Sequence, residues 1–226
     1  MLCAIHQLHY LPWLRYFDKI ARADTFIVLD NIQFNKNGWQ NRNKVKTSAG
    51  ATLLTVPVIA PLACDLHAVR IDDTQPWRKK HWATISQHYR KAPYFATHAP
   101  FLEEVYAREW QYLNALNRTM LDYFIGAIGL TTRVVYSSEL PVPGIATERL
   151  VNLLQAVGAR TYYSGAYALE QYLDIALLDA AGISLKLQDW TAPVYPQLHG
   201  EFVPELSVLD LLMNCGADSR RILTGG

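Results

Sequence analysis

The chain has 226 residues, of which 50% are hydrophobic and 18% are charged, and its formal net charge is +1. Such a composition excludes a disordered chain, which has too little apolar surface and too much charge to build a core. The near-neutral charge also removes bulk electrostatics as a reason to bind nucleic acid.

The cysteines and the apolar runs exclude two further classes. Cys3, Cys64 and Cys215 form no close pair, so neither a disulfide framework nor a metal-binding spacing is indicated. No run approaches the roughly 18 apolar residues of a transmembrane helix, and Met1 leads into an apolar stretch without a secretory pattern. We expect a cytoplasmic protein with one domain over residues 1–226, in which a lobe boundary would fall near residues 139–146, where Pro141 and Pro143 lie.

The first 30 residues predict a strand, a helix and a second strand. Leu2–Ile5 and Thr25–Leu29 are short apolar runs typical of buried parallel strands. Between them Leu14, Phe17 and Ile20 recur at helical spacing. Both strands run into polar residues, and in open α/β sheets ligands bind at that edge.

The rest of the chain continues this pattern. Further strands are expected at residues 51–57, 68–71, 132–136, 161–163 and 184–188. Helices are expected at residues 77–91, 100–128, 147–157 with Thr147 as N-cap, 169–181 and 208–214, and the tail after Gly216 is expected to fray. We predict a mixed α/β fold: a mostly parallel sheet flanked by helices on both faces, with a ligand cleft at the strand carboxyl ends.

Residues 31–46 read as a long loop in which Asn and Gln amides, Lys and Arg surround one Trp. Such side chains supply many directed donors, which suit a sugar, phosphate or carboxylate. The alternative is that the amides satisfy the backbone of their own loop. The residues that we expect to bind substrate are Gln7, Tyr10, Gln33, Trp39, Asn41, Arg42, Asn43 and Ser164.

Three residues are candidates for catalysis. Asp30 ends a buried strand, where a carboxylate is either an acid or base, a ligand contact, or a cap of the loop backbone. His81 lies on the apolar face of its predicted helix, as a core histidine or, where it reaches the cleft, a general base. His6 and His9 follow the first strand and partly resemble the HxGH turn of nucleotidyltransferases, whose Gly-His half is absent here. No third ligand accompanies this pair, so no metal site is predicted.

These residues resemble the WbqC family of bacterial proteins, which are found in O-antigen and other surface-polysaccharide gene clusters. The match opens with Ile5–Trp13, in which Leu8 replaces the family's proline, and continues with Asp30, Gln33-Phe34, Trp39 and Asn41–Asn43. Further matches are Trp77, His81, Tyr89, Pro93–Phe95, Ser137-Ser138, Thr147, Arg149-Leu150, Tyr163–Gly165, Tyr195, Gln197, Phe202 and Leu206–Leu212.

The resemblance implies transfer of an aminoacyl group, with glycyl as one candidate, in polysaccharide decoration. Our first hypothesis is a group-transfer enzyme that moves an acyl or aminoacyl unit from an activated donor onto an amino sugar or similar amine. Arg42 and the amides would hold an anionic or carbonyl oxygen, and Asp30 or His81 would accept the amine proton.

Two other hypotheses stay open. One is a nucleotide-dependent nucleotidyl- or adenylyltransferase that binds ATP or CTP with Mg²⁺ near His6 and His9. The other is a non-catalytic binding protein of the same pathway. The sequence leaves the cofactor unknown, and an aromatic content of 12% is compatible with a homodimer interface.

Overall fold

A computed structural model describes residues 1–225, which divide into two compact units. Unit 1 holds residues 1–7, 18–31 and 131–191, and unit 2 holds residues 8–17, 32–130 and those from 192 onward. The chain passes from one unit to the other within helix α1 (Leu14–Arg22). The proline-containing connection at residues 139–146 lies inside unit 1.

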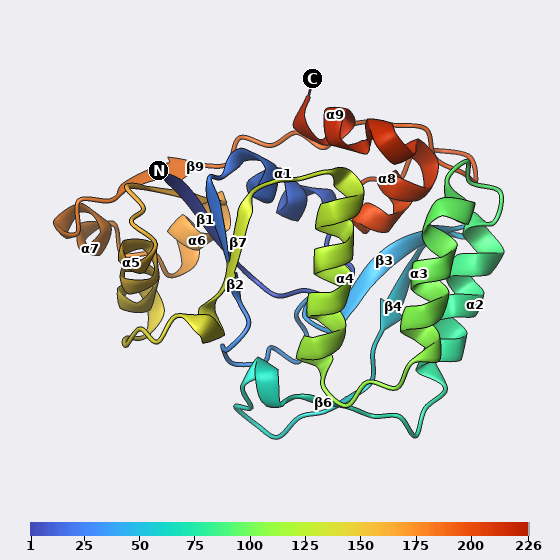
Figure 1. Cartoon of the computed structure of the whole chain (residues 1–226), viewed down its shortest axis with the longest axis horizontal. Helices are drawn as coiled ribbons and strands as arrows, with labels where there is room; N and C mark the ends of the chain where they lie inside the picture. The colour runs from blue at the N-terminus through green and yellow to red at the C-terminus, as the bar shows by residue number, and fades with distance from the viewer. Residues whose placement is uncertain (226) are drawn as a thin grey trace. The chain divides into compact units, whose positions relative to one another are not determined.

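Unit 1 is built on a five-stranded parallel sheet in the order β7-β2-β1-β8-β9 (Figure 1). The strands are β1 (Leu2–Gln7), β2 (Thr25–Leu29), β7 (Arg133–Tyr136), β8 (Thr161–Ser164) and β9 (Ser184–Leu187). Numbered among themselves in chain order, they run 3-2-1-4-5, which is the doubly wound arrangement. The predicted parallel sheet is therefore confirmed.

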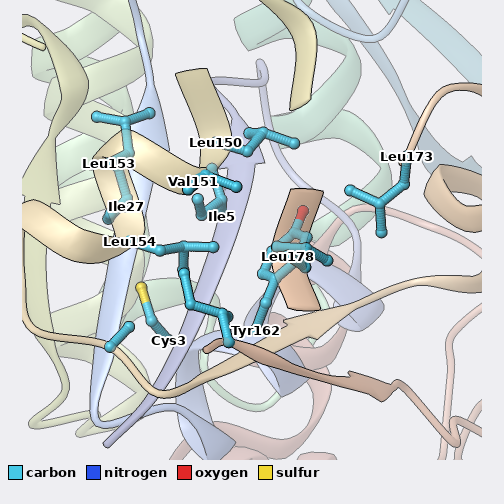
Figure 2. Close-up of a cluster of buried hydrophobic side chains, with 12 residues drawn as sticks. Cys3, Ile5, Ile27, Leu150, Val151, Leu153, Leu154, Tyr162, Leu173 and Leu178 are labelled. Carbon is cyan, nitrogen blue, oxygen red and sulfur yellow. The ribbon is translucent and has the colours of Figure 1, made fainter. Parts of the chain in front are cut away.

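Helices cover both faces of this sheet. On one face Leu150, Val151, Leu153 and Leu154 of α5 (Ala146–Ala156) pack with Ile5 and Ile27 of the strands (Figure 2). Each such fully buried aliphatic side chain contributes about 1.5–3 kcal/mol. Tyr162 belongs to this cluster. The next residue, Tyr163, points to the opposite face, where its hydroxyl lies 3.4 Å from Asp18 Oδ2 of α1.

Unit 2 combines a hairpin with several helices. Strands β3 (Arg42–Thr47) and β4 (Gly50–Thr55) pair antiparallel, and β5 (Val58–Ile59) pairs with β6 (Arg70–Ile71) after the 3₁₀ turn η1 (Leu66–Ala68). The helices are α2 (Trp77–Tyr89), α3 (Phe95–Ala107), α4 (Leu113–Ile128), α8 (Val208–Cys215) and α9 (Ser219–Thr224). In Figure 1, α2 and α3 lie side by side. The buried face of α2 holds Trp77, His81, Ile85 and Tyr89, so His81 lies on the apolar face as predicted.

Two expected elements of unit 2 are wrong. The loop at residues 31–46 ends at Arg42, where β3 begins; the polar composition of this strand hides it, although Val45 and Lys46 are buried. The single helix at residues 100–128 is two helices with Pro100 inside the first. The chain turns extended at Arg108, and the Trp110 indole N–H donates to the Val105 carbonyl oxygen at 2.8 Å, so a buried Trp interrupts the helix.

Three further helix predictions also differ from the structure. Thr147 is not an N-cap, because α5 begins at Ala146 and the Thr147 hydroxyl donates to the Tyr172 carbonyl oxygen at 3.1 Å. The helix expected at residues 169–181 is split into α6 (Ala166–Gln171) and α7 (Ile175–Ala180). The tail after Gly216 is ordered as α9 because Leu223 is buried there.

Candidate functional site

The carboxyl edge of the unit 1 sheet gathers polar residues from every strand, because parallel strands all end at the same edge. The residues are His6 and Gln7 of β1, Asp30 after β2, Ser137 and Ser138 after β7, Ser164 of β8 and Gln188 after β9. The predicted residues His6, Gln7, Asp30 and Ser164 thus share one edge. Its topological switch point lies between β1 and β8, since the strands that follow β1 lie on both sides of it.

Asp30 joins the end of β2 to the end of β7. Its carboxylate accepts the Ser138 N–H at 2.9 Å and the Ser138 hydroxyl at 2.7 Å, and Ser137 Oγ lies 3.1 Å from Oδ1. Asp30 is only 1% exposed, whereas Ser138 is exposed. These contacts are those of a carboxylate that caps backbone, and they also fix an exposed hydroxyl at the sheet edge.

Arg149 of α5 brings a positive charge to the same end of β2. Its Nη1 donates to the Asn31 carbonyl oxygen at 3.1 Å, and its Nη2 donates to the side-chain oxygen of Asn31. Among residues 1–225, no hydrogen-bond acceptor faces the buried Nε of Arg149. A buried donor without a partner costs about 1–3 kcal/mol, so the fold leaves this polar group unsatisfied.

A second cation lies beside the end of β8. A side chain at Gly165 would place its Cβ 3.5 Å from Lys19 Nζ, so the ammonium is next to the backbone just after Ser164. Lys19 is buried, as is Ser164, whose hydroxyl interacts with that of Tyr162. On β1, His6 is half-buried and its Nδ1 lies 3.3 Å from the Gln7 carbonyl oxygen. The two strands of the switch point therefore carry an imidazole, an amide and a hydroxyl, and the Lys19 ammonium of α1 lies beside the end of β8.

Asp18 organises the sheet face below this edge. The fully buried carboxylate accepts Arg22 Nε at 2.5 Å and Gln188 Nε2 at 2.7 Å, and the Tyr163 hydroxyl also faces it. Burial and the nearby carboxylate raise the pKa of Tyr163 to about 12, so the phenol stays protonated at neutral pH. Asp18 thereby joins α1, β8 and the residue after β9.

The other predicted residues belong to unit 2. The Tyr10 hydroxyl lies 2.9 Å from His81 Nδ1 and 2.6 Å from the Tyr106 hydroxyl, and all three side chains are buried. Burial lowers the pKa of His81 to about 4, although a hydrogen bond with the Thr55 backbone opposes that shift. His81 is therefore neutral at pH 7 and has the contacts of a hydrogen-bonded core histidine, one of its two predicted roles.

The amides of the Asn-rich segment bond to nearby backbone. Asn41 Nδ2 donates to the Val56 carbonyl oxygen at 2.9 Å, and Asn43 Nδ2 donates to the Leu11 carbonyl oxygen at 2.7 Å. Arg42 Nε donates to the Gly38 carbonyl oxygen at 3.2 Å. The two amides thus bond to backbone outside residues 31–46, and the Arg42 bond to Gly38 stays within that segment. Gln33 is exposed at a β-bridge to Asp65.

The Asn43 contact reaches a strained position. Leu11 has φ of 44°, a left-handed conformation that costs a non-glycine residue of order 1–3 kcal/mol. The side chains around this turn are packed together: His9 lies against Trp13 with ring centroids 5.2 Å apart, and Trp13 meets Trp39 edge to face at 5.1 Å. Trp39 is 36% exposed, so one aromatic surface remains accessible beside the turn.

Sequence reasoning missed the cations of the unit 1 edge. Arg149 and Lys19 lie on helices, where their sequence neighbours give no sign that they reach the ends of strands. Ser137 and Ser138 carried a signal, because they directly follow a predicted strand and parallel strands end at one edge.

Two features are absent from residues 1–225. No group of three or more His, Cys, Asp or Glu side chains is arranged to hold a metal ion in this part of the chain. None of its helices is both long enough and apolar enough to cross a membrane.

The fold and the edge define an α/β protein with a doubly wound parallel sheet and a polar carboxyl edge. The sequence model of the WbqC-like protein family matches residues 7–222, and the chain belongs to this family. The chain is also similar to "Uncharacterized protein Rv1507c" of Mycobacterium tuberculosis, with 38% identity over 220 residues that cover 96% of this chain and 94% of the relative. No solved structure gives a significant match.

Proposed function

We propose that the protein is a group-transfer enzyme that moves an acyl or aminoacyl unit onto an amino sugar or a similar amine. The observation that carries the proposal is the carboxyl edge of the unit 1 sheet, where His6, Gln7 and Ser164 flank the switch point and Lys19 and Arg149 bring positive charge. Small-molecule substrates bind at this place in doubly wound sheets.

The proposed reaction assigns roles to these groups. The amine nitrogen attacks the acyl carbonyl carbon, the bond from that carbon to the donor's leaving group breaks, and His6 accepts the proton that the amine loses. An imidazole titrates near neutral pH, which suits it to this transfer. The two cations favour the oxyanion that develops on the carbonyl oxygen. Asp30 acts as a positioning residue that holds Ser138 at the edge.

The resemblance to proteins of surface-polysaccharide gene clusters supports an amino sugar as the acceptor, with a glycyl unit as one candidate donor group. Such a reaction belongs to the cytoplasmic stage of polysaccharide assembly. A second candidate function is nucleotide-dependent nucleotidyl or adenylyl transfer. The 3-2-1-4-5 order favours it, because the classic dinucleotide-binding sheet begins with this order.

A ligand screen by thermal unfolding tests both candidates. The panel holds coenzyme A thioesters, glycyl donors, nucleotide-linked amino sugars, ATP and CTP, each with and without Mg²⁺. A ligand at 100 times its dissociation constant adds about 2.7 kcal/mol, which raises the Tm by about 5–11 °C for a chain of this size. A shift with an acyl donor or a nucleotide-linked amino sugar is expected. A shift that needs only nucleotide and Mg²⁺ would favour the second candidate.

Turnover with the ligands so identified tests the role of His6. His6→Ala is expected to lower kcat by about 10²–10⁴, the usual contribution of a general base. His67→Ala is the control, because His67 is an exposed histidine of unit 2 that the proposed reaction does not use. Equal turnover by the wild type and His6→Ala would remove His6 as the base, and a panel without any shift would favour a non-catalytic binding protein.

A further inference from the structure

Unit 2 contains a cavity of about 410 Å³ that is open to solvent and is lined by Ser48, Gln87, His88, Arg90, Lys91, Leu198 and His199. Its volume is in the range of small-molecule sites. The lining has two cations, two imidazoles, a hydroxyl and an amide, with one aliphatic side chain and no carboxylate. Within residues 1–225, neither Arg90 nor Lys91 forms an ion pair. The charge of this cavity is therefore uncompensated and positive.

The two histidines are held in place at the cavity. The Ser48 N–H donates to His88 Nδ1 at 3.4 Å, so the proton of the neutral His88 ring resides on Nε2, where it can be donated. His199 Nε2 donates to the His88 carbonyl oxygen at 2.8 Å, and the two rings meet edge to face at 5.5 Å. His199 has φ of 64°, and this bond helps to hold its backbone in a left-handed conformation.

A network of buried polar side chains holds the segments that line the cavity. Lys46 is only 1% exposed, and its Nζ donates to Gln197 Oε1 at 3.0 Å and to the Glu201 carbonyl oxygen. The Tyr89 hydroxyl accepts the Lys46 N–H at 2.7 Å and donates to Asp210 Oδ1 at 2.7 Å.

All of these residues except Asp210 are one or two positions from a cavity residue. Ser48 follows Lys46, His88 precedes Tyr89, and Leu198 and His199 follow Gln197. The network therefore preorganises the cavity before any ligand binds.

The position of the cations at the end of α2 also has an explanation that involves no ligand. Positive side chains near a helix C-terminus interact favourably with the helix dipole, and this effect alone could account for Arg90 and Lys91. It does not account for the hollow beside them, or for the residues from two distant segments that place His199 and Ser48 on its other sides. These features are those of a binding site.

We propose that this cavity binds the phosphoryl group of a small phosphate ester. One guanidinium and one ammonium charge, together with an imidazole N–H, match a dianion with several acceptor oxygens, and Arg is suited to bidentate contact with phosphate. The cavity is larger than a phosphate group alone needs, so Gln87 and Leu198 are left to contact the organic part of the ester. The site goes beyond the proposed group transfer, and its test does not depend on that reaction.

The first test is NMR titration of the histidine rings with sodium phosphate, glucose 1-phosphate and sodium acetate at equal ionic strength. Burial and the neighbouring His199 lower the pKa of His88 in the free protein. A dianion beside the ring is expected to raise that pKa by at least about one unit. The exposed His67 serves as an internal control and should not change. Equal changes at His67, or no change at His88, would overturn the proposal.

The second test is calorimetry with glucose 1-phosphate. Arg90→Gln/Lys91→Gln is expected to weaken binding at least tenfold, roughly the loss of one charge-assisted hydrogen bond. The control Lys79→Gln/Lys80→Gln removes the same charge from the same helix about 16 Å away, beyond a Debye length, and should change affinity less than about twofold. Equal weakening by both pairs would reduce the effect to overall charge and overturn the site. Acetate that binds as well as phosphate, or phosphate that binds where the ester does not, would overturn the assignment of a phosphate ester.

Discussion

The buried polar side chains at the sheet edge of unit 1 and those in the interior of unit 2 occupy different places in their elements. In unit 1 the buried Asp30 and Ser164 stand where strands end. In unit 2 Lys46 lies within a strand, and His81 and Asp210 lie within helices. A polar group at a strand end faces the place where ligands bind, whereas one inside an element joins it to its neighbours. Substitutions in the interior of unit 2 should therefore act mainly on stability, and those at the edge of unit 1 mainly on ligands.

The largest effect on stability is expected for Lys46→Met. The substitution removes the charge that faces Asp210 and the Lys46 donor to the Glu201 carbonyl oxygen and to Gln197 Oε1, which keeps the Val203 N–H. Loss of one member of a buried charged network costs about 3–5 kcal/mol. Urea unfolding measures the loss. Lys44→Met on the same strand is the control, because Lys44 is exposed and should cost about 0.5 kcal/mol or less. Similar losses of unfolding free energy for the two variants would show that the buried network of unit 2 does not govern its stability.

The next effect is a dependence of stability on pH that comes from His81. Its pKa is about 4 in the folded protein and 6.5 when unperturbed, so between these values the unfolded chain binds more protons. The free energy of unfolding should therefore fall by about 3 kcal/mol as the pH drops from 6.5 to 4.

In His81→Phe this part of the acid-side slope should disappear, although the variant also loses the Tyr10 hydrogen bond at every pH. The exposed His67→Gln should keep the slope of the wild type. Urea unfolding at a series of pH values measures both variants, and an unchanged slope in His81→Phe would show that the histidine is not buried in its neutral form.

The smallest of the three effects is expected for Asn43→Ala. The variant loses the bond to the strained Leu11 carbonyl and leaves a buried acceptor unpaired, at a cost of about 1–3 kcal/mol. Asn37→Ala in the exposed part of the same segment should stay within about 0.5 kcal/mol. If chemical denaturation gave equal losses, or if Asn43→Ala changed ligand affinity more than stability, the amides would have the binding role first predicted for them.

The unit 1 sheet could be predicted because each of its strands can be recognised from its own short stretch of sequence. Apolar runs such as Thr25–Leu29 end in polar residues, and the parallel arrangement then brings His6, Asp30 and Ser164 to one edge. Strand β3 could not be found this way. Its sequence, RNKVKT, is mostly polar, because Asn43 and Lys46 are buried with partners that come from other parts of the chain.

The same reasoning explains what was missed at the two sites. The positions of Arg149 and Lys19 depend on how their helices pack on the sheet. The cavity in unit 2 joins residues that are more than 100 positions apart, such as Ser48 and His199. The periodicity of neighbouring residues does not predict such long-range contacts. His199 stood in a proline-broken stretch whose only visible quality was its mixture of aromatic, amide and imidazole side chains.

The interleaving of the two units also decides the order in which the chain can fold during synthesis. Strands β1 and β2 are made first, but β7 begins only at Arg133 and the α5 leucines that cover Ile5 and Ile27 come later still. At bacterial and eukaryotic elongation rates, roughly 5–20 s pass between residues 31 and 131. During this interval the apolar side chains of β1 and β2 are not yet covered by α5. Unit 1 needs residues up to 191 and Tyr89 of unit 2 needs Asp210, so neither unit can be complete when its first strands leave the ribosome.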